Sequence, residues 1–78
     1  MSLVEAAQKG NLDRVRLLVE QGTDKDKGDS HGQTALYLAT WFDHLDVVQY
    51  LVEQGASLDK ADNSGVTPLA EATCRGHL

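Results

Sequence analysis

The feature that most constrains this chain is an internal repeat with a period of 33 residues. The run Leu18–Gly22 returns unchanged at Leu51–Gly55, and Thr34 matches Thr67 at the same offset. A period of this length is typical of stacked supersecondary units, none of which can bury its apolar face alone. We therefore look for function on a surface of the stack, not in an enclosed cavity.

The sequence predicts short helices that recur in each unit. Leu12, Val15, Leu18 and Val19 form an apolar stripe at helical spacing, and the stripe returns one period later. Glycine is expected to end these helices, because it adopts the left-handed conformation without strain. The predicted helices run from Leu3 to Gly10, from Asn11 to Gly22, from Thr34 through Phe42, from Leu45 to Gly55 and from Thr67 onward.

Polar loops separate the helix pairs. Thr23–Gln33 has almost no apolar content, and Ala56–Val66 is its counterpart one period later. Such a composition predicts a turn or a short hairpin in solvent. Between the third and fourth helices, Asp43 stands where Gly10 stood one unit earlier. We expect Asp43 to be left-handed, because aspartate tolerates that conformation at some cost.

The order of turn, helix and helix, with Thr67, Pro68 and Leu69 opening a first helix, resembles the ankyrin repeat. The residues that carry the resemblance are Gly32–Ala39, Gly65–Ala72, His44–Val48 and Leu51–Ala56. The resemblance implies an all-α solenoid of stacked antiparallel helix pairs with projecting β-turn or hairpin loops. It divides the chain into an N-terminal repeat without its turn (1–22), a full repeat (23–55) and a truncated repeat (56–78).

Besides Asp43, which replaces a glycine, four positions depart from the ankyrin pattern. Tyr37 and Ala70 stand where a histidine is expected at the third helical position, so the hydrogen bonding usually linked to that ring is not assumed. Ala35 replaces proline, and Lys25 stands where the matching residue of the next unit is Leu58. These changes bear on local stability more than on the fold.

The last predicted helix has no second helix after it. Leu69 would then be covered on one side only, whereas repeat arrays normally end in a unit with a polar outer face. We therefore interpret the chain as a piece of a longer array. We expect it to be weakly stable or to self-associate through its C-terminal end.

Composition and charge argue against several classes of function. Twelve acidic and seven basic residues give a net charge of −5, and the two signs are interspersed, which argues against a nucleic-acid surface. The longest aliphatic run, Leu17–Val19, is too short to span a membrane, and the first residues lack the regions of a signal peptide. Cys74 is the single cysteine, so no intrachain disulfide forms. We expect an intracellular protein, cytoplasmic or nuclear, without a cofactor.

Trp41 and Phe42 are the first candidates for a binding site. Three of the four aromatic residues lie between Tyr37 and Phe42, and a spacing of four puts Tyr37 and Trp41 on one helical face. The resemblance places 41 and 42 at the groove-side end of a first helix. Truncating an aromatic anchor costs about 2 kcal/mol of binding or more. The alternative is that a ring packs against the neighbouring unit, Phe42 more so than Trp41.

Residues at equivalent but non-repeating positions complete the candidate site. Those of the loops are Ser30, His31, Gln33, Asn63, Ser64 and Val66. The first-helix equivalents of the aromatic pair are Gln8, Lys9, Cys74 and Arg75. Taken one at a time, the loop residues are better explained as solvated turn residues, so only the whole set predicts a site.

Metal binding and catalysis are not predicted. His44 and His77 are one period apart and are interpreted as repeat-defining residues at the helix-to-helix turn. Cys74 and His77 are the only close pair of metal-ligating type, whereas zinc usually takes four ligands. Asp29–His31 contains the three residue types of a nucleophilic triad, but adjacent loop residues rarely place a nucleophile, a base and an orienting group in the geometry that a triad requires. No glycine-rich phosphate loop precedes a helix.

The sequence favours a non-enzymatic module that binds another protein or a peptide. Trp41 and Phe42 would act as apolar anchors, with the loop tips supplying polar specificity. The acidic balance favours a partner with basic patches. The alternative is architectural, namely a spacer or cap of a longer solenoid whose binding site lies elsewhere.

Overall fold

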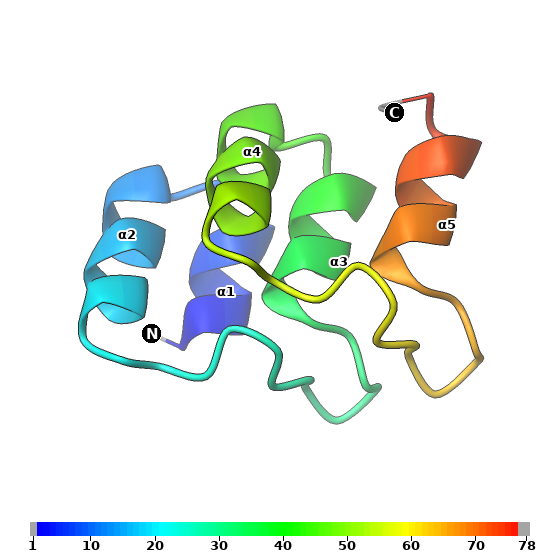
Figure 1. The fold of residues 1–78 in the computed structure, drawn as a ribbon, viewed down its shortest axis with the longest axis horizontal. Coiled ribbons are helices and arrows are strands. Elements are labelled where there is room, and N and C mark those ends of the chain that lie inside the picture. Colours follow the sequence, from blue (N-terminus) through cyan, green and yellow to red (C-terminus); the bar gives the residue numbers. More distant parts are fainter. Residues whose placement is uncertain (1, 77–78) are drawn as a thin grey trace.

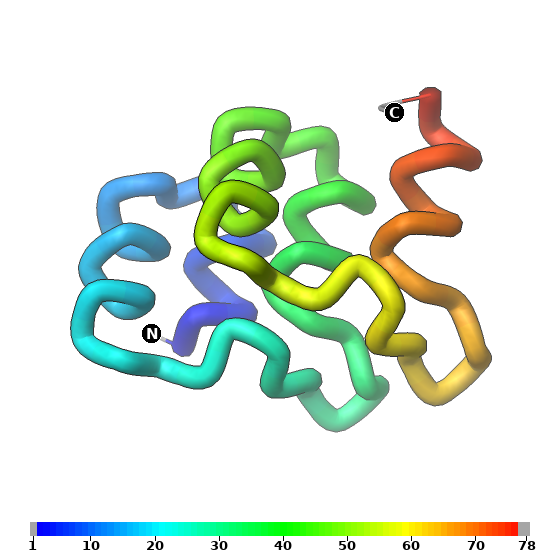
Figure 2. The backbone as a smooth tube through the Cα atoms, viewed as in Figure 1, coloured from blue at the N-terminus to red at the C-terminus, as the bar shows by residue number. Residues whose placement is uncertain are grey.

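The computed structural model describes residues 2–76, within which the chain forms α-helices and no β-strand. The helices are α1 (Leu3–Gln8), α2 (Leu12–Glu20), α3 (Ala35–Trp41), α4 (Leu45–Glu53) and α5 (Pro68–Cys74). In Figure 1, α1, α3 and α5 follow one another along the long axis, and α2 and α4 form a second row. Figure 2 shows both long loops projecting at the same edge of the stack. The expected all-α solenoid is confirmed.

The apolar core lies between the two rows of helices. Val15, Val47 and Leu51 from the second row are fully buried, as is Leu36 from α3. In the first row, α1 packs on α3 and α3 packs on α5, while α2 packs on α4 in the second row. The helices therefore bury apolar side chains against helices from a neighbouring pair, as the repeat period predicts. The predicted stripe of α4 is only partly buried, because Leu45 and Val52 are exposed.

The predicted helix starts are confirmed. The Asn11 side chain accepts a hydrogen bond from Arg14 N at 3.1 Å, and Thr34 accepts one from Tyr37 N at 3.2 Å. Thr67 makes the same bond to Ala70 N, ahead of a proline in the first turn. These side chains satisfy backbone donors that have no partner within the helix.

Two left-handed residues form the elbows between paired helices. Gly10 has φ 72° and Asp43 has φ 62°, so the predicted left-handed aspartate is confirmed. At each elbow the following amide reaches back to a carbonyl five residues earlier: Asn11 N donates to Ala6 O and His44 N donates to Ala39 O. This bond gives a carbonyl at the end of the first helix a hydrogen-bond donor, and it turns the chain toward the start of the second helix.

His44 joins the two elbows. Its Nε2 lies 2.9 Å from the carbonyl oxygen of Gln8, and its ring lies against Gly10. A Cβ atom at position 10 would lie only 2.6 Å from His44 Nδ1. Gly10 is therefore required both for its positive φ and for the space that the ring occupies.

The long loops are also joined to each other. Ser57 N donates to Asp26 Oδ1 at 2.7 Å, and the Lys60 ammonium donates to the Asp26 carbonyl. At the tips, Asn63 N donates to His31 O at 2.9 Å and Asn63 Nδ2 donates to Ser30 O at 3.1 Å. All four donors belong to 56–66 and all acceptors to 23–33. The loops that the sequence predicted as solvated turns or hairpins therefore form one connected layer.

Two glycine substitutions separate backbone strain from loss of space at the elbow. Gly22 also has a positive φ, but a Cβ atom there would meet nothing within 4 Å. Gly22→Ala should therefore lower the free energy of unfolding by the left-handed penalty alone, about 1 kcal/mol. Gly10→Ala should cost roughly 1 kcal/mol more, because it also displaces the His44 ring. Urea denaturation of both variants measures the difference, and equal losses would contradict the packing role of His44.

Candidate functional site

The aromatic residues at the end of α3 divide into one buried ring and two exposed ones. Tyr37 is only 4% exposed, whereas Trp41 and Phe42 are each 45% exposed. Tyr37 and Trp41 stack with their centroids 6.4 Å apart, as their spacing of four predicts, and Phe42 stacks on the His44 ring at the same separation. The expectation that Phe42 is the more packed of the exposed pair is wrong, because the two are equally exposed.

The side chain of Arg75, at the end of α5, contacts the ring of Trp41. Its guanidinium carbon lies 4.7 Å from the centroid of the Trp41 ring, and its Nε donates to Glu71 Oε1 at 2.6 Å. Its Nη1 lies 3.9 Å from Asp43 Oδ1. The hydrogen bond to Glu71 is the largest influence that raises the pKa of Arg75. Trp41 is therefore held between its own helix and a cation supplied by the next unit.

A hollow of about 360 Å³ lies beside the two exposed rings. We call it the aromatic hollow, and it is lined by Gln8, Asp29, His31, Gln33, Leu38, Trp41 and Phe42. These residues come from α1, from the first long loop and from α3, so the hollow exists only when the units are stacked. Five of its members were expected from the sequence, and Asp29 and Leu38 were not.

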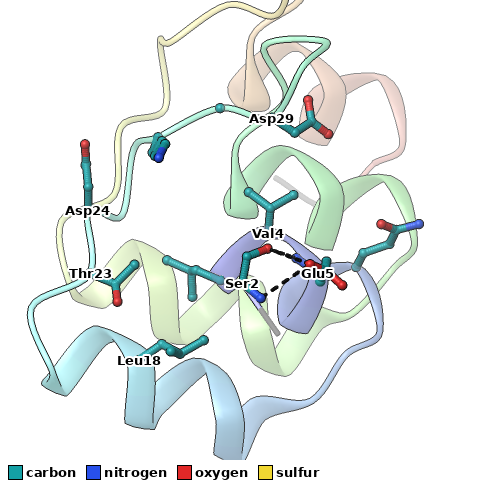
Figure 3. Close-up of a pocket in the computed structure, with 11 residues that line it drawn as sticks. Ser2, Val4, Glu5, Leu18, Thr23, Asp24 and Asp29 are labelled. Atoms are coloured by element: carbon teal, nitrogen blue, oxygen red, sulfur yellow. Dashed lines mark hydrogen bonds between the residues drawn. The ribbon is translucent and has the colours of Figure 1, made fainter.

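A second hollow of about 460 Å³ adjoins α1 at the N-terminal end of the stack. In Figure 3, Val4 and Glu5 lie on its helical side, and Asp24 and Asp29 lie on the loop. We call it the N-terminal hollow. Gln8 and Asp29 line both hollows, which are therefore neighbouring parts of one groove between the first-row helices and the loop.

The arrangement of helix pairs, left-handed elbows and projecting loops agrees with a comparison of the sequence with known families. A family model described as ankyrin repeats, in three copies, matches residues 3–78. This chain belongs to the ankyrin repeat family. Ankyrin repeats are generally protein–protein interaction modules and are typically non-enzymatic. No curated protein matches the chain.

Several of the expected site residues of this ankyrin chain lie outside the aromatic hollow. Asn63 is exposed, but its backbone N–H and its side-chain amide already donate to the preceding loop, and Tyr37 is buried. Arg75, at the C-terminal end of α5, contacts the Trp41 ring but does not line the aromatic hollow. The remaining ones, Ser30, Lys9, Ser64 and Val66, do not line the aromatic hollow, and only Val66 is half-buried.

Two aspartates that were not predicted as site residues shape the ankyrin loops. Asp29 Oδ1 accepts from His31 N at 2.9 Å and from Gln33 N at 3.0 Å. Asp62, one period later, accepts the equivalent bonds from Ser64 N and Val66 N. The sequence contained a signal for this role, because aspartate three residues before glycine recurs at the period of the repeat. The Asp29 carboxylate accepts hydrogen bonds from backbone amides of its own turn, an arrangement that does not make a triad with the His31 ring.

Asp62 also reaches the first row of helices. Its backbone hydrogen bonds, that from Val66 first, lower the pKa of its carboxyl group. Burial raises the pKa of the Tyr37 phenol, and a hydrogen bond to Asp62 raises it further. Tyr37 stands at the position where the ankyrin pattern has histidine. It therefore contacts the next loop, a contact that the sequence alone did not predict.

Neither a metal-ligand group nor a membrane-spanning helix is found in the described part of the ankyrin chain. Within residues 2–76, no three side chains of histidine, cysteine, aspartate or glutamate are grouped as a metal site. Cys74 has an exposed thiol, and His77 lies outside the described residues. Among the described helices, none has the length and apolar character needed to cross a bilayer.

Proposed function

We propose that this ankyrin chain binds a protein or a peptide through the groove between its loops and its first-row helices. The observation that supports this most directly is the aromatic hollow, where two exposed aromatic rings adjoin polar groups from two other segments. Aromatic anchors beside polar groups are typical of the energetic centre of protein interfaces. Trp41 and Phe42 act as the anchors, and Gln8, His31 and Gln33 give polar specificity.

The rigidity of the groove supports the same proposal. His44 fixes one elbow against the other, and Asn63 fixes one loop tip against the other. A surface that is already ordered loses less conformational entropy when a partner binds. A spacer segment has no need to expose two large aromatic side chains on such a surface.

Replacing Trp41 tests the proposal. Trp41→Ala should weaken partner binding by about 2 kcal/mol or more, because it removes an anchor from the centre of the interface. The same substitution should lower the free energy of unfolding by only about 1 kcal/mol, since the ring is half exposed. Binding is measured by isothermal titration with a selected peptide, and stability is measured by urea denaturation.

Leu17→Ala is the matched control for Trp41→Ala. Leu17 is 46% exposed, close to the exposure of Trp41, but it lies on α2 and lines neither hollow. It should leave binding unchanged. Equal effects of the two substitutions on binding, or equal losses of binding and stability in Trp41→Ala, would count against the groove.

The C-terminal end of the stack supports a second, architectural candidate. Leu69 of α5 is 38% exposed, whereas Leu36, its equivalent one period earlier, is 1% exposed. Leu45 and Val52 of α4 are also exposed, while their equivalents Leu12 and Val19 are half-buried against the core. These side chains form an apolar face that is suited to stacking on further helices or to self-association.

The second candidate predicts concentration-dependent association through this face. Sedimentation velocity should show a shift toward larger species as the concentration rises, and Leu69→Glu should abolish the shift by placing a charge on the face. Glutamate is compatible with the first turn of α5, where the helix dipole favours an anion. Leu17→Glu, on another surface, should leave the association intact. A wild-type protein that stays monomeric at all concentrations would rule this candidate out.

A further inference from the structure

We propose that the aromatic hollow receives a lysine or arginine side chain of the partner, with the Asp29 carboxylate as its counter-charge. This inference rests on the proposed function of the groove and specifies its ligand. Nothing in the ankyrin fold itself requires a cation at this place. Three features favour a cation here: the orientation of the Asp29 carboxylate, the shape of the hollow and the charges that line the groove.

The Asp29 carboxylate is oriented by its own turn. Oδ1 accepts both backbone hydrogen bonds, from His31 N and Gln33 N. Within residues 2–76, Asp29 Oδ2 accepts no hydrogen bond and forms no ion pair. Asp29 is half-buried and lines the hollow, so a second oxygen with negative charge is held at its wall. A partner that covered this oxygen without supplying a donor would leave a desolvated charge unpaired, which is costly.

The rest of the hollow suits a long side chain with an apolar stem. Leu38 is buried beneath it, and the rings of Trp41 and Phe42 form apolar walls. Gln8 and Gln33 supply amide groups that can accept hydrogen bonds from a cationic tip. Lysine and arginine pack their methylene stems on apolar surface while keeping the charged end among polar groups. A short polar side chain would leave the rings uncovered, and an acidic one would face Asp29.

The charges along the groove have the sign that attracts a cation. Five titratable residues line the two hollows. Three are acidic, namely Glu5, Asp24 and Asp29, and the other two are Lys27, which is basic, and His31. Arg75, beyond Trp41, is paired with Glu71 and lies near Asp43, so two carboxylates offset its charge. The field near the hollow is therefore negative, and it favours a basic segment over an acidic one.

The test begins with a phage-displayed library of random nonapeptides selected on the wild-type protein. We expect the binding peptides to be enriched in lysine or arginine at one position. The selected peptide is then synthesised in its basic form and with that residue replaced by acetyl-lysine or citrulline, which remove the charge. Trp41 is the single tryptophan of the chain, so its fluorescence reports binding at the hollow. The neutral peptide should bind about two- to fivefold more weakly in low salt.

Asp29→Asn identifies the counter-charge. Asparagine keeps an Oδ1 that can accept the bonds from His31 N and Gln33 N, so the turn is preserved while the charge is removed. This variant should bind the basic and neutral peptides with nearly equal affinity. Asp62→Asn is the matched control, because Asp62 makes the equivalent turn bonds but does not line the aromatic hollow. It should keep the two- to fivefold preference for the basic peptide.

The outcomes separate this inference from the proposed function. Peptides that require Trp41 but carry no basic residue, or a preference for the basic form that survives Asp29→Asn, would overturn the inference and leave the groove as the binding site. A selection that yields no peptide dependent on Trp41 would overturn both.

Discussion

The structure depends on the mutual burial of apolar side chains by helices from adjacent pairs. Val15, Val47 and Leu51 are fully buried between the two rows, yet no helix in the described chain exceeds nine residues. Helices this short are marginal in isolation, because nucleation is costly and few hydrogen bonds follow it. The folding of one helix pair is therefore coupled to the folding of its neighbours. The groove depends on this coupling, because its lining residues come from three segments.

Hydrogen bonds between units convert this packing into a defined surface. His44 reaches the Gln8 carbonyl across the elbows, and Asn63 reaches Ser30 and His31 across the loop tips. Burial alone is non-directional and would tolerate small slips between units. The hydrogen bonds have geometric requirements that fix the register. Gln8 thus accepts the hydrogen bond from His44 and also lines both hollows. The contact between the elbows and the recognition surface therefore share this residue.

The sequence predicted the features that have local causes. The caps at Asn11 and Thr34 and the left-handed Asp43 follow from a few adjacent residues and their repetition, and all are confirmed. Features that depend on distant residues were not predicted. Tyr37 is buried against the loop that carries Asp62, and Arg75 stacks on Trp41 from another helix, so neither contact has a signature in its own segment. The equal exposure of Trp41 and Phe42 likewise depends on how the whole groove closes around them.

The hydrogen bonds between the two long loops all run in one direction. Ser57, Lys60 and Asn63 donate from the later loop, and the earlier loop supplies acceptors only. The loop layer therefore has a direction, and its two edges differ in the hydrogen-bonding groups that they present. If two copies met through the same end about a two-fold axis, like edges would face each other and these bonds could not form between them. Such a pair could touch only through its helices, whereas an array that extends head to tail could continue the loop layer without a break.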